Sequence, residues 1–163
     1  MSTFKIETWG CQMNEHDSER MAGLLNQRGH SAIGSDDTAL AQIVLLNTCA
    51  VREKAEDKLY SRLGELRMLK EKNPEMVIAV AGCIGQMSGE AIFKRAPFVD
   101  LVLGPRAVKN LPELIERAKI QRTIDTNLYE DSVRFGYDTA TRNSPGKAWI
   151  TVMEGCNKTC TYC

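Results

Sequence analysis

Residues 42–49 read QIVLLNTC, and this stretch decides the fold. Its apolar run is continuous instead of alternating, which is typical of a strand covered on both faces. Strands of that kind occur almost only in parallel sheets that lie between layers of helices. The stretch therefore predicts a buried central strand in an α/β domain.

Apolar runs and amphipathic segments alternate on both sides of this strand. We expect strands at residues 4–8, 30–33, 42–47, 77–80 and 98–103. We expect helices at residues 14–29, 52–72, 86–95 and 105–118, with Thr48 as the cap of the second. Strands that alternate with helices pair in parallel through right-handed crossovers. The sequence therefore predicts a doubly wound, mostly parallel α/β fold.

The chain divides by composition into three parts. Residues 1–137 form the predicted α/β domain, with a further strand and loop at its end. Residues 138–146 are rich in Thr, Ser, Asn, Pro and Gly, which is a linker composition. Residues 147–163 begin a second domain, whose first strand we expect at 148–153, with Trp149 in its core.

The charge balance and the absence of apolar targeting segments in the sequence narrow the classes of protein to which the chain can belong. The 163 residues carry 21 basic and 21 acidic side chains, so no long-range field attracts an anionic polymer. The first residues lack the apolar segment of a secretory signal, and no stretch is long enough to span a membrane. Six cysteines without an export signal favour the reducing cytoplasm, where clustered thiols indicate metal binding or catalysis.

Three of the cysteines each follow a predicted strand. Cys11, Cys49 and Cys83 lie one to three residues after the strands at 4–8, 42–47 and 77–80. Because the carboxyl ends of parallel strands meet at one edge of a sheet, these thiols can converge there. Glycines precede Cys11 and Cys83 and permit tight turns. The alternative is that all three are ordinary small apolar residues.

The other three cysteines are closely spaced at the end of the chain. Cys156, Cys160 and Cys163 form a C-x3-C-x2-C pattern. Three thiolates on a short loop can bind three irons of a cubane cluster and leave the fourth iron open. The alternatives are free thiols or part of a zinc ribbon, which ordinarily has four protein ligands.

This terminal pattern resembles the signature of the radical S-adenosylmethionine enzymes, with Tyr162 as its aromatic residue. The resemblance implies that Cys156, Cys160 and Cys163 hold a 4Fe–4S cluster. It also implies that S-adenosylmethionine binds the open iron and is cleaved to a 5′-deoxyadenosyl radical.

Four motifs together resemble the methylthiotransferases, a branch of that superfamily. They are WGCQMNEHDSER at 9–20, NTCAVREKAED at 47–57, GCIGQ at 82–86 and MEGCNKTCTYC at 153–163. The resemblance implies a second 4Fe–4S cluster held by Cys11, Cys49 and Cys83. It further implies a barrel and a small RNA-binding domain after Cys163, so we expect the 163 residues alone to be inactive.

The motifs are most similar to the branch that adds a methylthio group to carbon 2 of isopentenyl-adenosine in tRNA. The alternatives are the branches that act on a ribosomal-protein aspartate or on threonylcarbamoyl-adenosine in tRNA. A non-catalytic iron–sulfur or zinc module is an alternative of another class. The resemblance implies a cytoplasmic monomer whose partners are the tRNA anticodon loop and an electron donor such as flavodoxin or ferredoxin, without a membrane.

Several polar residues near the motifs have two interpretations each. Asn14 and Asp17 either orient the cluster or substrate, or cap a helix. Arg52 either neutralises the second cluster or is a solvated helix residue. Lys54, Glu56, Asp57 and Lys58 are expected to form a solvated helix face.

Overall fold

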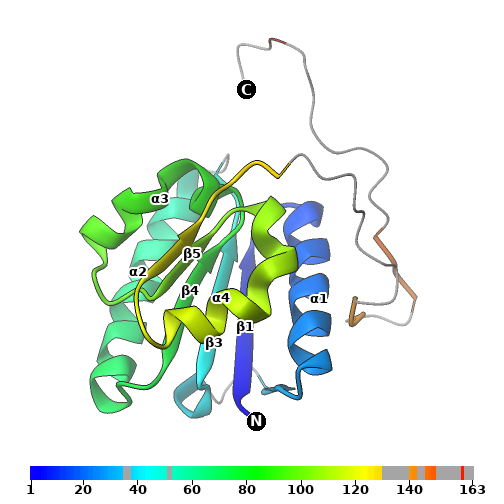
Figure 1. Cartoon of the computed structure of the whole chain (residues 1–163). Helices are drawn as coiled ribbons and strands as arrows, with labels where there is room; N and C mark the ends of the chain where they lie inside the picture. The colour runs from blue at the N-terminus through cyan, green and yellow to red at the C-terminus, as the bar shows by residue number, and fades with distance from the viewer. Residues whose placement is uncertain (35–37, 51–52, 130–139, 143–145, 150–158, 160–163) are drawn as a thin grey trace.

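A computed structural model of the chain shows a parallel sheet between two layers of helices (Figure 1). It describes residues 1–34, 38–50, 53–129, 140–142, 146–149 and 159. The predicted doubly wound α/β fold is confirmed, because all neighbouring strands are parallel and helices cover both faces of the sheet.

The sheet has six strands in the order β2-β1-β3-β4-β5-β6. The strands are β1 (Thr3–Trp9), β2 (Ser31–Ala32), β3 (Ile43–Thr48), β4 (Val77–Ala81), β5 (Leu101–Leu103) and β6 (Thr123–Asp125). Every residue of β3 and β4 is buried, as the continuous apolar runs predict. The strand predicted at 98–103 is shorter, since only its last three residues pair in the sheet.

Four α-helices and two 3-10 helices connect the strands. The α-helices are α1 (Gln12–Gln27), α2 (Glu53–Lys72), α3 (Cys83–Arg95) and α4 (Leu111–Ala118), and the 3-10 helices are η1 (Thr38–Leu40) and η2 (Pro105–Asn110). Met21 and Leu25 of α1 share one core with Leu111 of α4. Leu59 of α2 and Ile92 of α3 share the core on the other face of the sheet.

Thr48 is the last residue of β3, and the cap of α2 lies outside the described residues. Three predicted helix boundaries were wrong. The helices predicted from residues 14 and 86 begin earlier, at Gln12 and Cys83. The helix predicted at 105–118 is divided into η2 and α4, because Pro112 has no N–H with which to continue the α-helical hydrogen bonds.

The strand order creates a switch point between β1 and β3. The chain passes from β1 to β2 on one side, and β3 then pairs with the other side of β1. Helix α1 follows β1 and packs on one face, whereas α2 follows β3 and packs on the other. Open α/β sheets bind ligands at the carboxyl ends of the strands at such a point.

The predicted linker is described in part, and Thr141 within it contacts α1. The Thr141 amide donates to the Glu19 carbonyl oxygen at 3.0 Å, and the Asn26 side chain donates to the Thr141 hydroxyl at 3.1 Å. Ala148 and Trp149 do not belong to a strand, so those two positions of the predicted strand at 148–153 were wrong. Residues 150–153 lie outside the described residues.

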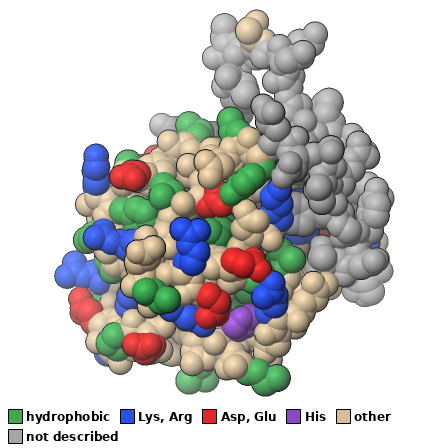
Figure 2. Space-filling view, viewed as in Figure 1, with side chains coloured by type: hydrophobic (Ala, Val, Ile, Leu, Met, Phe, Trp, Pro, Cys, Tyr) green, Lys and Arg blue, Asp and Glu red, His purple; other side chains and the backbone are tan. Residues whose placement is uncertain are grey.

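The surface carries charges of both signs. Figure 2 shows basic and acidic side chains interspersed on the face in view, as the balanced composition leads one to expect. Within the described residues, no helix is both long and apolar enough to cross a membrane.

Candidate functional site

The carboxyl edge of the sheet brings three cysteine-bearing loops together. Trp9 of β1 pairs with Thr48 of β3, and Asn47 pairs with Ala81 of β4. Cys11, Cys49 and Cys83 follow these paired positions by one or two residues. Because neighbouring strands are only about 5 Å apart, the structure places the three loops side by side at one edge.

The electrostatics of Cys83 indicate that the three thiols are close. Burial raises the pKa of the Cys83 thiol, and the charges of Cys49, Cys11 and Asp17 raise it further. A hydrogen bond with the Ala50 backbone acts in the opposite direction. None of the three cysteines forms a disulfide bond; Cys49 is buried, and the other two are partly exposed. The three thiols therefore lie near one another at the rim of the sheet.

Two of these cysteines lie at the beginning of a helix. Cys11 is the N-cap of α1, and Cys83 is the first residue of α3. A helix N-terminus presents free N–H groups and a positive dipole end, which favour a thiolate or an anionic ligand. The sequence analysis predicted such a start after Cys11 but missed the one at Cys83. The start of α2 near Cys49 cannot be compared, because residues 51–52 lie outside the described part of the chain.

Glycines make the close approach of the loops possible. A Cβ atom on Gly82 would lie 2.5 Å from Asn47 Oδ1 and 2.6 Å from the Thr48 carbonyl oxygen, and Gly82 has a φ of +89°. A Cβ atom on Gly10 would lie 2.3 Å from Asn14 Oδ1. A side chain at either position would push the neighbouring elements apart.

A buried polar network lies beneath the cysteines. The Asn14 side chain accepts hydrogen bonds from the amide and the thiol of Cys11, at 3.2 and 3.4 Å, and donates to Asn47 Oδ1 at 3.1 Å. The Asn47 amide group donates to the Asn14 carbonyl at 2.8 Å and to the Ser18 hydroxyl at 2.9 Å. The Ser18 and Thr8 hydroxyls are 2.7 Å apart. These bonds join α1 to β1 and β3.

The sequence analysis did not single out Asn47, Ser18 or Thr8. Asn47 itself could have indicated the network from sequence. An amide side chain at the end of an otherwise apolar strand that is covered on both faces needs hydrogen-bond partners. Asn14 caps the helix and also contacts the Cys11 thiol, so its two interpretations are compatible.

The other polar residues considered from sequence have simpler environments. Asp17 is buried and forms an ion pair with Arg20 at 3.3 Å. Lys54, Glu56, Asp57 and Lys58 are exposed, as predicted. Arg52 lies outside the described residues.

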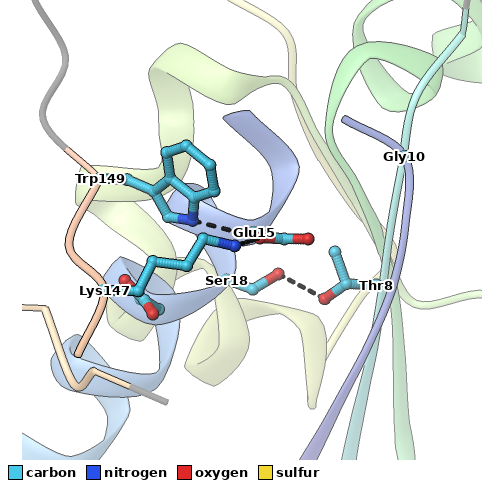
Figure 3. Close-up of a pocket in the computed structure, with 7 residues that line it drawn as sticks. Thr8, Gly10, Glu15, Ser18, Lys147 and Trp149 are labelled. Atoms are coloured by element: carbon cyan, nitrogen blue, oxygen red, sulfur yellow. Dashed lines mark hydrogen bonds and ion pairs between the residues drawn. The ribbon is translucent and has the colours of Figure 1, made fainter. Parts of the chain in front are cut away.

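A further pocket lies beside the loop of Cys11. It has a volume of about 340 Å³, and its lining combines α1 and β1 with Lys147 and Trp149 (Figure 3). Trp149 is half-buried, and its indole N–H donates to Glu15. The expectation that Trp149 belongs to the core of a strand was therefore wrong. The sequence pattern gave no signal for its contact with α1.

The chemistry of the three side chains suits an iron–sulfur cluster, because such clusters are normally held by cysteine thiolates. Within the residues that the structure describes, no group of three or more His, Cys, Asp and Glu side chains is arranged to hold a metal ion. The reduced cysteines and the helix N-termini are consistent with an iron–sulfur cluster at this edge. Cys156, Cys160 and Cys163 lie outside the described residues.

Fold and site together define a class: a doubly wound α/β domain with three cysteines at its switch point. Residues 3–104 match the family described as Uncharacterized protein family UPF0004, and the chain belongs to that family. The match covers β1 through β5 and includes all three cysteines of the site.

The chain is also similar to curated bacterial proteins named tRNA-2-methylthio-N(6)-dimethylallyladenosine synthase. The protein from Pseudomonas savastanoi is 47% identical over 97% of this chain and 36% of its own length. The proteins from Thermobifida fusca and Chromobacterium violaceum are 45% and 42% identical, over 99% and 100% of this chain and 32% and 37% of their own lengths. The chain thus spans about a third of the length of these relatives.

Proposed function

We propose that this chain is the amino-terminal part of a methylthiotransferase that modifies tRNA. The proposed reaction adds a methylthio group to carbon 2 of an adenosine that carries a dimethylallyl (isopentenyl) group, beside the anticodon. The relatives named for this product align with 97–100% of the chain. The observation that supports the proposal most is the meeting of Cys11, Cys49 and Cys83 at the switch point.

The proposed roles of the described residues follow from their positions. Cys11, Cys49 and Cys83 would hold a 4Fe–4S cluster. The N-termini of α1 and α3 would stabilise its negative charge. Asn14 would hold the loop of Cys11 in place through the hydrogen bond that its side chain accepts from the Cys11 backbone amide. Metal uptake would release the protons of the three thiols, because cysteine binds iron as the thiolate.

The second proposed site consists of Cys156, Cys160 and Cys163, which would hold a cluster that binds S-adenosylmethionine. When both clusters are bound, they supply the one-electron and sulfur-transfer chemistry that side chains cannot provide at an unactivated C–H bond. An electron donor such as flavodoxin or ferredoxin is part of the proposal, as is the splaying of the target base from a single-stranded RNA loop.

The test is an analysis of tRNA nucleosides in a strain that lacks this modification. The full-length gene that contains this chain should restore the methylthio-dimethylallyl nucleoside, and the same gene with Cys49→Ala should not. Appearance of a methylthiolated threonylcarbamoyl-adenosine, or of a methylthiolated ribosomal-protein aspartate, would assign the enzyme to one of the other branches. Absence of any methylthiolation, with zinc bound instead of iron, would refute the proposal.

A further inference from the structure

Glu15 connects α1 to the segment that precedes the terminal cysteines. The indole N–H of Trp149 and the ammonium group of Lys147 both donate to Glu15 Oε2 at 3.1 Å (Figure 3). The Lys147 ammonium group also lies 4.2 Å from the centre of the Trp149 ring. The Glu15 carboxylate therefore binds both Lys147 and Trp149, and these two side chains also form a cation–π contact with each other.

Thr141, which precedes Lys147 in the chain, also contacts α1. Thr141 is bonded to Glu19 and Asn26, farther along the helix, whereas Lys147 and Trp149 contact Glu15 near its beginning. The contacts of Thr141, Lys147 and Trp149 therefore follow α1 in the direction opposite to the helix. That direction leads toward the carboxyl edge of the sheet, where Cys11 lies.

Chain geometry limits how far apart the two cysteine groups can be. Glu15 follows Cys11 by four helical residues, a rise of about 6 Å. Cys156 follows Trp149 by seven residues, which span at most about 25 Å when fully extended. While Trp149 contacts Glu15, the first terminal cysteine can therefore lie no farther than about 25 Å from Trp149.

We propose that Glu15 is a positioning residue that docks residues 147–149 on α1 and so limits how far apart the two cysteine sites can lie. This inference rests on the proposed function, because a group made at one site must reach a reaction centre at the other. Glu15 touches no reacting atom in this proposal and acts only through the segment that it holds. The contact also closes one side of the pocket beside Gly10.

The exposure of the contact predicts how it responds to salt. The side chains of Glu15 and Lys147 are 51% and 53% exposed. Exposed ion pairs are individually weak and are screened by salt, so the docking should be reversible. Trp149 provides a direct probe, because the chain contains only one other tryptophan, Trp9.

The first experiment measures Trp149 fluorescence in the 163-residue chain with Trp9→Phe. We expect Glu15→Ala to shift the emission to longer wavelength and to raise acrylamide quenching toward that of the urea-unfolded chain. High salt should cause the same change in the parent chain and little change in the variant. Glu90→Ala is the matched control, because Glu90 is exposed on α3 and has the same charge.

Two further variants test whether Glu15 and Lys147 act through the same contact. Lys147→Ala should raise the quenching, and the double variant should match Glu15→Ala, since both changes break the same contact. Circular dichroism and urea unfolding confirm that each variant is folded. An unchanged emission and quenching in folded Glu15→Ala would overturn the docking.

The second experiment uses the full-length protein that contains this chain, after anaerobic reconstitution. Glu15→Ala should retain the iron content, the cleavage of S-adenosylmethionine and the KM for tRNA, but its kcat for methylthiolation should fall about tenfold, because misplacement of reacting groups is costly. Equal kcat values, with Trp149 released from α1, would overturn the positioning role. Absence of methylthiolation by the parent protein would refute the proposed function instead, and the fluorescence would still decide the docking.

Discussion

Asn47 is the residue on which the cysteine edge most depends. It is fully buried, and its side chain joins Asn14 and Ser18 of α1 to β3. Its identity could be read from the sequence, but its partners could not. Asn14 and Ser18 lie more than 28 positions away in the chain, and no local pattern connects them.

Replacement of Asn47 by alanine should destabilise the chain by about 1–3 kcal/mol, because Asn14 would be left with unpaired buried groups. Urea unfolding measures this difference. Asn73→Ala is the control and should change the free energy of unfolding by no more than about 0.5 kcal/mol, since Asn73 is not fully buried and its amide group has no comparable network. Equal effects of the two changes would show that the Asn47 network contributes little.

The lowered pKa of Glu7 predicts how the free energy of unfolding depends on pH. Burial raises the pKa of its carboxyl group, but hydrogen bonds and charges from Arg62, with a smaller effect of Lys5, lower the pKa below its ordinary value of 4.5. The Arg62 guanidinium donates two bonds to this carboxylate, at 2.8 and 2.7 Å. A lowered pKa means that the stabilisation is complete above the unfolded-state value and is lost as the pH falls through the folded-state value.

Glu7→Gln should therefore be less stable than the parent chain at pH 7, by about 1 kcal/mol. The difference should shrink as the pH falls below about 4.5. Urea unfolding at several pH values measures the difference in the free energy of unfolding between Glu7→Gln and the parent chain. Glu71→Gln, which removes an exposed ion pair with Arg67, should have little effect at any pH. A Glu7 difference that grows in acid would contradict the assigned direction.

At the scale of elements, the beginning of α3 decides where Cys83 lies. Gly82 is the N-cap of this helix and adopts a positive φ in contact with β3. The sequence analysis predicted the helix three residues too late, because Gly82 has no side chain that could mark it as a cap and Cys83 is not a typical helix-start residue. The pattern of strands was easier to predict, since β3 and β4 are apolar on both faces.

Gly82→Ala and Gly64→Ala form a matched pair. Gly82→Ala should destabilise the chain by at least about 1–3 kcal/mol, because the new Cβ meets Asn47 and Thr48 and the backbone is strained. Gly64 lies within α2, and a Cβ there would meet nothing within 4 Å. Gly64→Ala should therefore stabilise the chain by about 0.5–1 kcal/mol. Thermal unfolding compares the two, and a tolerated Gly82→Ala would contradict the close packing of this edge.

At the scale of the whole molecule, the alternation of strands and helices was sufficient to predict the sheet and its cysteine edge. Parallel topology carries the ends of β1, β3 and β4 to one place without any information about side-chain contacts. The docking of Trp149 on Glu15 could not be predicted, because it joins residues 134 positions apart through exposed groups. The role of the cysteines as cluster ligands stays a prediction.

The most direct test is anaerobic reconstitution of the 163-residue chain in which Cys156, Cys160 and Cys163 are all replaced by alanine. Iron and acid-labile sulfide are then counted per chain. The account predicts about four irons and four sulfides, and their loss when Cys49→Ala is added. Zinc uptake without sulfide, or the same iron content after Cys49→Ala, would contradict it.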